Sequence, residues 1–556
     1  MKTKKVMFLV FLITFSLCAI NTQTVSSQTT EGIIYIESDG SIYVSTGETL
    51  PIEKDGNVYT LTGDIYGYYI DVDCSNLVID GAGYSIVSGL DAGIDLSYAS
   101  SVTVKNLQVG SAFYGIFLLN STGCTITGNT LTYNGYGISA YTSSDNTISG
   151  NTLTNNDVGI DIESSSYITL TNNFMNNTHN LAIYGTEGAH YDHTIDTSNT
   201  VNGKKVYYLV SKTDLVISPS TYPDAGYLAL VNCDNVTVYD MELANNAHGI
   251  LLAYTTGSAI TQNNLTDNYT GIGFFACSAN TVSENNIFEN YRGVQLSSGS
   301  TANSIASNNI CTNVEGLFLF DSSQNYIFTN NITDNDIGIG FSESSNNLIR
   351  GNYFVDNTDQ FYDKNSYDTS ITRSTNIWDV SYPLGGNYWS DYTGVDVMSG
   401  EDQDEDGSDG IGDTPYTLYG SNVDSYPLMP YGTPFGIVIS SPENKTYTTT
   451  DVTVEFTVTE DASLIQYSLD GQANVTITGS KTFSDLAEGT HSLTVYAQAA
   501  DDLTEASKTV YFTIAEGAEP AETDEESFSV TLIIAAIAIA VVVGVASLYF
   551  LKTKKE

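Results

Sequence analysis

Short apolar, β-branched runs alternate with turn-forming residues through most of the chain, and this alternation repeats. The segments TGNTL, SGNTL, TNNFM, TQNNL, SENNI, ASNNI, FTNNI and RGNYF recur at a spacing of about 22 residues within each run. Their central residues are Asn129, Asn151, Asn173, Asn263, Asn285, Asn308, Asn330 and Asn352. A fixed step of this length indicates a solenoid.

Two further sets of residues, which we call columns, recur at the same spacing. About nine residues after the asparagine, a glycine precedes an apolar residue, as in Gly137-Ile138 and Gly271-Ile272. A β-branched pair such as Thr147-Ile148 closes each unit. No unit has the 3.6-residue spacing of an amphipathic helix. The pattern therefore predicts an all-β protein with a right-handed parallel β-helix over 70–375, in which coils of three short strands stack about 4.8 Å apart.

The repeated asparagines have a structural interpretation and a functional one. Asparagine tolerates the left-handed conformation of a tight turn, and its amide can bond to its counterpart in the next coil. The alternative is a sugar-binding ladder on the surface, which we consider weaker. After the leader, the chain has five cysteines, and an odd number argues against a fully paired disulfide framework. Cys74, Cys124, Cys233 and Cys277 precede the closing strand, where small buried residues are expected.

The repeat is interrupted near 180–230. The string HTIDTSNTVNGKKVYYLV at 193–210 predicts a hairpin or a widened coil, and an insertion of this kind can shape a groove. We expect an N-terminal cap over 28–69 and a C-terminal cap over 376–432. Alternating runs such as VTVEFTV and KTVYFTI then predict an immunoglobulin-like β-sandwich over 433–515.

The two ends of the chain predict a secreted, membrane-anchored protein. Residues 1–27 combine a basic start with an apolar run, which is typical of a signal peptide. An acidic stalk over 516–527 leads to an uncharged segment, and we predict a single transmembrane helix over 528–551. The basic tail 552–556 would stay in the cytoplasm, which places the rest at the cell surface.

The net charge of the chain narrows the classes of molecule that it is expected to bind. Asp and Glu number 65 against 18 Lys and Arg, giving a formal net charge of −47. Such a field disfavours nucleic acid and anionic membrane surfaces and favours cations. It is more typical still of a protein whose acidic surface keeps it soluble in salt.

One acidic loop has the spacing of a calcium site. In EDQDEDGSDGIGD, acidic residues alternate before a glycine, as oxygen ligands do around Ca²⁺. The candidate ligands are Asp402, Asp404, Asp406, Ser408, Asp409 and Asp413. A calcium ion bound here would be structural and would hold the loop over the last coil.

The residues from about Asp64 to Pro430 resemble the NosD-like β-helix proteins, especially archaeal surface forms. The resemblance rests on the NN-and-GI repeats, on DTSNTVNGKKVYYLV and on GGNYWSDYTG, DGIGDTPY and SYPLMP. It implies a carbohydrate-binding or sugar-hydrolase type of β-helix on the cell surface. The family string is closer to DxDGDGIGD, so Ser408 is an insertion that leaves Asp406 and Asp409 as alternative ligands. The family name implies copper, for which His179, His190 and His193 are the candidate ligands.

The sequence supports no catalytic assignment and no organic cofactor. Asp161 and Glu163 would face opposite sides if Ile162 points inward, or share an outward face at an edge. Asp334 with Asp336 is a second acidic pair, and Arg292 with His248 is a basic patch. None of these repeats across adjacent coils to mark a cleft.

Three hypotheses remain open. The first is a protein that binds polysaccharide or other envelope components, or that serves an architectural role. The second is a lyase, glycoside hydrolase or epimerase acting in the β-helix groove, which a cleft with clustered acids would favour. The third is copper delivery, which rests on the family name alone.

Overall fold

The computed structural model describes residues 32–363, 374–419, 421–429, 437–443, 445–458, 462–499 and 505–515. The chain divides into two compact units between residues 429 and 430. The only helix among the described residues is a short 3-10 helix, η1 (Gly188–Tyr191). No described helix is long and apolar enough to cross a bilayer. The predicted signal peptide, and the stalk, transmembrane helix and tail, lie outside the described residues.

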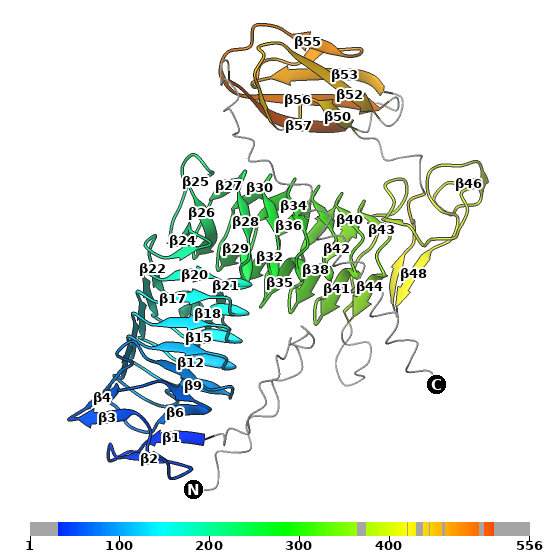
Figure 1. Ribbon diagram of the computed structural model, residues 1–556. Helices are drawn as coiled ribbons and strands as arrows, with labels where there is room; N and C mark the ends of the chain where they lie inside the picture. The colour runs from blue at the N-terminus through cyan, green and yellow to red at the C-terminus, as the bar shows by residue number, and fades with distance from the viewer. Residues whose placement is uncertain are drawn as a thin grey trace, which may run out of the picture. The chain divides into compact units, whose positions relative to one another are not determined.

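The first stack of coils covers residues 32–201 and has three sheets (Figure 1). Sheet A consists of β1 (Gly32–Ile36), β2 (Ile42–Val44), β6 (Tyr68–Val72), β9 (Ala92–Asp95), β12 (Tyr114–Leu119), β15 (Tyr136–Tyr141), β18 (Val158–Glu163) and β21 (His179–Tyr184). Sheet B consists of β3 (Ile52–Asp55), β4 (Val58–Leu61), β7 (Val78–Asp80), β10 (Thr103–Lys105), β13 (Thr125–Thr127), β16 (Thr147–Ser149), β19 (Thr169–Thr171) and β22 (Thr194–Ile195). Sheet C begins with β5 (Ile65–Tyr66), β8 (Ser85–Val87), β11 (Gln108–Gly110), β14 (Thr130–Thr132), β17 (Thr152–Thr154), β20 (Phe174–Asn176) and β23 (Thr200–Val201).

The second stack covers the coils from residue 204 onwards, and sheet C runs through both stacks. In the second stack, sheet C continues with β24 (Lys204–Val210), β26 (Ala225–Val231), β29 (His248–Ala253), β32 (Thr270–Phe275), β35 (Arg292–Ser297), β38 (Glu315–Phe320), β41 (Ile337–Ser342) and β44 (Asp359–Asp363). Sheet D consists of β25 (Val216–Ile217), β27 (Thr237–Tyr239), β30 (Ala259–Thr261), β33 (Thr281–Ser283), β36 (Ser304–Ala306), β39 (Tyr326–Phe328) and β42 (Leu348–Arg350). Sheet E consists of β28 (Glu242–Ala244), β31 (Asn264–Thr266), β34 (Asn286–Phe288), β37 (Asn309–Cys311), β40 (Asn331–Thr333), β43 (Tyr353–Val355) and β45 (Tyr388–Trp389).

Strands of successive coils pair in parallel and in register, which confirms the predicted right-handed parallel β-helix. In sheet B, for example, Thr125 lies opposite Thr147 and Ile126 opposite Ile148. Both isoleucines are fully buried. Parallel pairing begins at β1, which pairs with β6, so it includes part of the segment expected to be a cap. One hydrophobic cluster fills the first stack and extends onto strands β24, β26, β29 and β32 of sheet C, and a second cluster fills the second stack.

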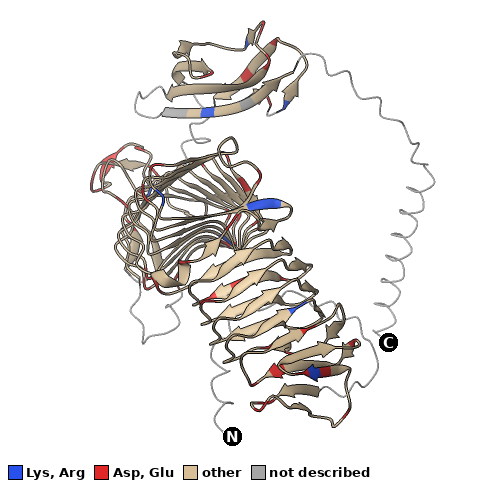
Figure 2. Cartoon of the chain, turned by 90° about the vertical axis from the view of Figure 1, so that its left-hand side faces the viewer, with Lys and Arg blue, Asp and Glu red and all other residues tan. Residues whose placement is uncertain are grey.

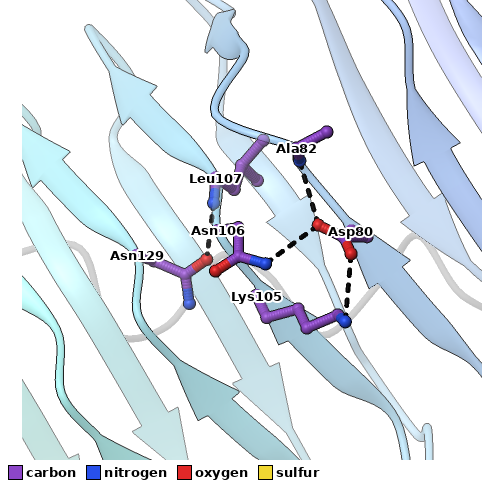
Figure 3. Close-up of polar contacts among 6 residues, drawn as sticks. All are labelled: Asp80, Ala82, Lys105, Asn106, Leu107 and Asn129. Carbon is purple, nitrogen blue, oxygen red and sulfur yellow. Dashed lines mark hydrogen bonds and ion pairs between the residues drawn. The ribbon is translucent and has the colours of Figure 1, made fainter.

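Ladders of buried asparagines run along the corners of the coils, and they confirm the structural interpretation of the repeat. Figure 3 shows one step, in which the Leu107 amide donates to Asn129 Oδ1 over 3.0 Å. Asn129 Nδ2 in turn donates to the Val104 carbonyl and to Asn151 Oδ1, each over 3.0 Å. The second stack has three such ladders, formed by Asn263, Asn285, Asn308, Asn330, Asn352 and Asn387; by Asn280, Asn303, Asn325, Asn347 and Asn376; and by Asn268, Asn290, Asn313, Asn335 and Asn357.

The prediction that the ladder asparagines themselves adopt the left-handed conformation is wrong, because the residue before each of them adopts it. The positive φ belongs to the residue before the ladder position, such as Gly128 (φ 65°), Asn172 (φ 56°) or Glu284 (φ 58°). The ladder asparagine follows this turn, and its side chain points into the coil. The sharp turn is therefore made by one residue and the polar groups are satisfied by the next.

The glycine column is explained by the carbonyl of the next coil. A Cβ at Gly137 would lie 2.6 Å from the carbonyl oxygen of Gly159, and one at Gly271 would lie 2.6 Å from that of Gly293. Real Cβ atoms do not come this close to a backbone oxygen. Glycine recurs here because the coils stack too tightly at this corner for any side chain.

The stacks join through a hairpin in the region where the repeat is interrupted. Strands β23 and β24 pair antiparallel, and Asn202 (φ 51°) and Gly203 (φ 78°) form the turn between them. The hairpin alternative predicted for this segment is confirmed. The long Gly-Ile strands belong to sheet A before the hairpin and to sheet C after it, so sheet A ends at β21.

Two tryptophans close the core of the second stack. Trp389 stacks on Phe354 with a centroid distance of 4.4 Å and on Tyr416 at 4.6 Å, and its indole Nε1 donates to Asp424 Oδ2 over 2.9 Å. Asp424 also accepts from the backbone amide of Asn387 and thereby ends an asparagine ladder. Four short strands complete this end: β46 (Met398–Ser399), β47 (Glu405–Asp406), β48 (Tyr416–Tyr419) and β49 (Asn422–Asp424).

The C-terminal unit contains two sheets whose apolar side chains form one cluster. One sheet consists of β50 (Ile437–Ser441), β52 (Val452–Val458) and β55 (Lys481–Phe483). The other consists of β51 (Thr446–Tyr447), β57 (Glu505–Ile514), β56 (Gly489–Ala499), β53 (Ala462–Leu469) and β54 (Val475–Thr476). The immunoglobulin-like assignment of this unit stays a prediction.

The five cysteines among the described residues are free thiols. Cys124, Cys233 and Cys277 are buried, as expected of small core residues, whereas Cys74 and Cys311 are partly exposed. The thiol of Cys277 accepts a hydrogen bond from the Thr255 amide over 3.4 Å. Cysteine thus takes the position that serine hydroxyls occupy in other coils.

Candidate functional site

A pocket of about 80 Å³ lies at the junction of the two stacks. Most of its walls come from the last three strands of sheet A, and two residues come from the second stack. The lining residues are Tyr136, Val158, Asp161, Glu163, His179, Ala182, Tyr184, Ala247 and Tyr269. We call it the junction pocket.

Strand β18 supplies two carboxyl groups to the same side of this pocket. Ile160 and Ile162 point inward and are fully buried, so Asp161 and Glu163 both point outward. The expectation that an inward Ile162 would separate the two acids is therefore wrong, because residues two apart on a strand share a face. Their Cα atoms lie about 6.6 Å apart by the rise of an extended strand.

Burial makes both carboxyl groups hard to ionise. The pKa of Asp161 is raised to about 7, chiefly by burial and also by the neighbouring Glu163 charge, against the opposing effect of a 3.1 Å hydrogen bond from Ser139 Oγ. The pKa of Glu163 is raised as well, by burial. Burial lowers the pKa of His179, so the imidazole is favoured in its neutral form. The pocket can therefore hold a neutral carboxylic acid beside a carboxylate near pH 7.

The outward face of sheet A leads along the first stack to this pocket. Its aromatic and acidic side chains lie in register on successive strands, about 4.8 Å apart. The outward-facing residues are Tyr69 and Asp71 on β6, Asp95 on β9, Tyr114 and Phe117 on β12, Tyr136, Ser139 and Tyr141 on β15, and Asp161 and Glu163 on β18. Tyr114 stacks on Phe117 at 4.4 Å, and its ring lies 5.3 Å from that of Tyr136. We call this face the tyrosine lane.

The second stack forms the end wall of the lane. The ring of Tyr269 lies 6.2 Å from that of His179 and stacks on Tyr291 at 4.8 Å. Arg292 packs beside these rings, 5.5 Å from Tyr291 and 5.9 Å from Tyr269, and forms an ion pair with Glu315. Its charge is therefore already balanced within the wall.

The predicted basic patch of Arg292 and His248 does not exist as such. His248 is 5% exposed, and burial lowers its pKa to about 3, so this histidine is neutral. Its ring packs 5.0 Å from that of Tyr184. Of the two residues only Arg292 is charged, and Glu315 neutralises that charge.

The candidate calcium loop is organised around a residue that the sequence analysis missed. Asp396 accepts hydrogen bonds from Ser408 Oγ and from the amides of Asp409 and Gly410. Asp413 Oδ1 accepts from the amides of Val397 and Met398, each over 3.1 Å.

The other candidate ligands of this loop are spread out. Asp409 Oδ2 accepts from the Gly400 amide and from Gln403 Nε2, whereas Asp402, Asp404 and Asp406 are exposed. Among the described residues, no three His, Cys, Asp or Glu side chains are placed to hold one metal ion. Calcium binding stays a prediction.

The histidines named as copper ligands serve other contacts. His179 lines the junction pocket, His193 Nδ1 accepts from the Ile168 amide over 3.2 Å, and His190 Nδ1 accepts from the Thr186 amide over 3.1 Å. With these nitrogens engaged and no three-ligand group in the described parts of the chain, the residues do not fit a copper site.

The tyrosines of the lane and the pocket were not singled out by the sequence, although a signal existed. Tyr114 and Tyr136 both stand directly before the glycine of the Gly-Ile column, one coil apart. Tyr269 does not stand directly before a glycine, and it lines the pocket from the second stack, so the same pattern does not identify it. The second acidic pair, Asp334 and Asp336, lies exposed at a turn and takes no part in the pocket.

Comparisons with solved structures give distant likenesses. A mutant of the periplasmic alginate epimerase AlgG is 13% identical, with a TM-score of 0.25, and the match covers 59% of this chain and 78% of that one. DFA-IIIase from Arthrobacter chlorophenolicus A6 in complex with GF2 is 13% identical, with a TM-score of 0.25, covering 51% of this chain and 83% of that one. No curated protein matches the chain.

The family comparison is more extensive. The model described as periplasmic copper-binding protein (NosD) matches residues 12–208 and again residues 197–394. The two matches meet in the joining hairpin, and each contains most of one stack. They cover well over half of the chain, including the asparagine ladders and the junction. The chain therefore belongs to the NosD family.

Proposed function

We propose that this protein binds a polysaccharide along the tyrosine lane, with the junction pocket as the main binding site. The supporting observation is the register of the lane, which places aromatic rings and carboxyl groups on successive strands of one face. Aromatic rings pack against the apolar faces of sugars, and carboxylates accept hydrogen bonds from hydroxyl groups. The repeat of one strand per step suits a ligand that is itself a repeating chain.

The charge of the lane favours a neutral glycan over an acidic one. The lane and the pocket carry Asp71, Asp95, Asp161 and Glu163, and the pocket lining contains no Lys or Arg. Basic residues are few and scattered over the described chain (Figure 2). An acidic polysaccharide would meet like charges on β6 and β9 and again on β18, which costs affinity.

Binding is tested with the full-length protein on a panel of neutral and acidic oligosaccharides. Tyr136→Ala and Glu163→Gln should each weaken binding about tenfold or more, because each removes a contact inside the pocket. Tyr326→Ala is the matched control, since Tyr326 is 48% exposed on the second stack and away from the pocket. Absence of binding to every neutral glycan would refute the proposal.

A second candidate function is glycoside hydrolysis, which the acid pair on β18 favours. Hydrolases use one protonated and one ionised carboxyl group about 5 to 10 Å apart. Asp161, with its pKa near 7, would protonate the leaving oxygen, and Glu163 would take a proton from the attacking water. Shortened products measured by mass spectrometry, lost in Asp161→Asn and kept in Asp334→Asn, would support this activity. Unchanged glycans across the panel would exclude hydrolysis and leave binding as the proposed function.

The cell-surface location and the calcium loop belong to the same proposal. The terminal segments of the sequence support export and anchoring, which protease treatment of intact cells would test by releasing the large ectodomain. For calcium, the buried Oε1 of Gln403 has no hydrogen-bond partner and adds an oxygen to the loop. We expect chelation to lower the melting temperature of the wild type and to leave an Asp409→Ala variant unchanged. Equal responses of both proteins to the chelator would contradict the calcium site.

A further inference from the structure

The tyrosine lane is closed at the junction end. Sheet A stops at β21, and the next elements belong to the second stack. Backbone hydrogen bonds tie the two together, from the Asn180 amide to the Asn245 carbonyl over 2.9 Å and from the Ala247 amide to the Leu181 carbonyl over 3.3 Å. A ligand that follows the lane therefore meets a wall of packed backbone and side chains.

The closure falls at the junction pocket itself. Tyr269 and Ala247 line the pocket from the second stack, opposite the acids of β18. A volume of about 80 Å³ is far below the roughly 300–1,000 Å³ of a pocket that encloses a whole small ligand. The pocket has room for one edge of a sugar ring with its hydroxyl groups. It does not have room for a chain that continues beyond.

We propose that the junction pocket receives the terminal sugar of a neutral glycan, so that the protein recognises chain ends. This inference rests on the proposed function, and it specifies which part of the glycan is bound. An internal sugar uses one of its hydroxyl groups in the next glycosidic bond, whereas the terminal sugar keeps that group free. Asp161 and Glu163 stand at the closed end, where they would accept hydrogen bonds from the free hydroxyl.

The chemistry of the pocket makes this distinction strong. Asp161 is 8% exposed, and a buried carboxyl group that loses its partner on binding is costly, at about tenfold to hundredfold in affinity. A glycan whose terminal hydroxyl is blocked would offer these carboxyl groups no donor beyond the bond that Ser139 makes to Asp161 Oδ2, and it would also press against Tyr269. Selection thus comes from a missing hydrogen bond and from a steric clash at the same place.

Orientation of an immobilised glycan tests the proposal. A neutral oligosaccharide that binds the full-length protein is coupled to beads through its reducing end in one batch and its non-reducing end in the other. End recognition predicts binding to one batch and at least a tenfold loss on the other. It also predicts one protein per free chain in solution, whatever the chain length.

The alternatives give different results. Equal binding to both batches, with more proteins bound per chain as the chain grows, would overturn end recognition and leave the proposed function intact. No binding to any neutral glycan would refute the proposed function itself. Tyr269→Ala is expected to reduce the difference between the two batches, whereas Tyr326→Ala should preserve it. An unchanged difference in Tyr269→Ala would exclude this residue as the wall.

Discussion

The asparagine ladder leads to a prediction that two adjacent residues can test. Asn285 is buried, whereas Asn286 is exposed on the same turn. Asn285 Oδ1 accepts from the backbone amide and from the side-chain amide of Asn263, each over 2.9 Å, and Asn285 Nδ2 donates to the Ile260 carbonyl over 2.8 Å. The exposed side chain of Asn286 donates to Asn264 Oδ1 over 3.1 Å and accepts from Asn309 Nδ2 over 2.8 Å.

The expected loss follows from the groups left without partners. Asn285→Ala leaves the buried backbone amide of Asn263 without its acceptor, whereas Asn263 Nδ2 keeps its bonds to the Val238 and Thr261 carbonyls. A buried group without a partner costs about 1–3 kcal/mol, so we expect a decrease of about 1–3 kcal/mol in the free energy of unfolding. Asn286→Ala should stay within about 0.5 kcal/mol, because water replaces its exposed contacts.

Urea denaturation followed by tryptophan fluorescence measures both variants, since the two tryptophans close the same stack. Hydrogen exchange would locate the loss, and the amide of Asn263 should lose protection in Asn285→Ala. Equal stabilities of the two variants would refute the reasoning, because the ladder would then contribute no more than a surface contact.

Three further outcomes follow from the structure. Burial raises the pKa of Asp424 from 3.8 to about 7, so its contribution to stability is complete below pH 3.8 and is lost as the pH rises through 7, a loss on the order of 4 kcal/mol. The melting temperature should therefore fall from pH 5 to 8 by less in Asp424→Asn than in the wild type. Gly271→Ala should cost about 3 kcal/mol or more, because its Cβ would meet the Gly293 carbonyl at 2.6 Å, whereas Gly188→Ala, whose Cβ would lie at an ordinary 3.4 Å from Tyr254, should be nearly neutral by the same denaturation assay. Alkylation of the native protein followed by peptide mass spectrometry should modify Cys74 and Cys311 first and reach the buried cysteines Cys124, Cys233 and Cys277 only on unfolding.

The repeat was predictable because its causes are local. The Gly-Ile column, the ladder asparagines and the closing β-branched pairs each occupy a fixed place in a coil, so their spacing alone indicates three strands and three turns. Even the joining hairpin carried a signal, the Asn202-Gly203 pair of a tight turn. The exact residue with positive φ was missed because glycine, asparagine, glutamate and serine all fill that position.

The junction pocket was not predictable, because it depends on a change of sheets. Asp161 and Glu163 were noted as a pair, but their neighbours across the pocket, Ala247 and Tyr269, are more than 80 residues away in the sequence. No period of the repeat connects these positions. The role of Asp396 in the acidic loop was missed for a related reason, since it lies before the alternating run and reaches back to it through backbone amides.

The division of the β-helix into two stacks separates the length of the lane from the chemistry of its end. The junction pocket uses only β15, β18, β21 and the first coils of the second stack. Duplicating one 22-residue unit before β12 would lengthen the lane by about 4.8 Å and would leave every pocket residue in place. Gene duplication can therefore change how many sugars the lane contacts, one coil at a time, without altering the pocket at its end.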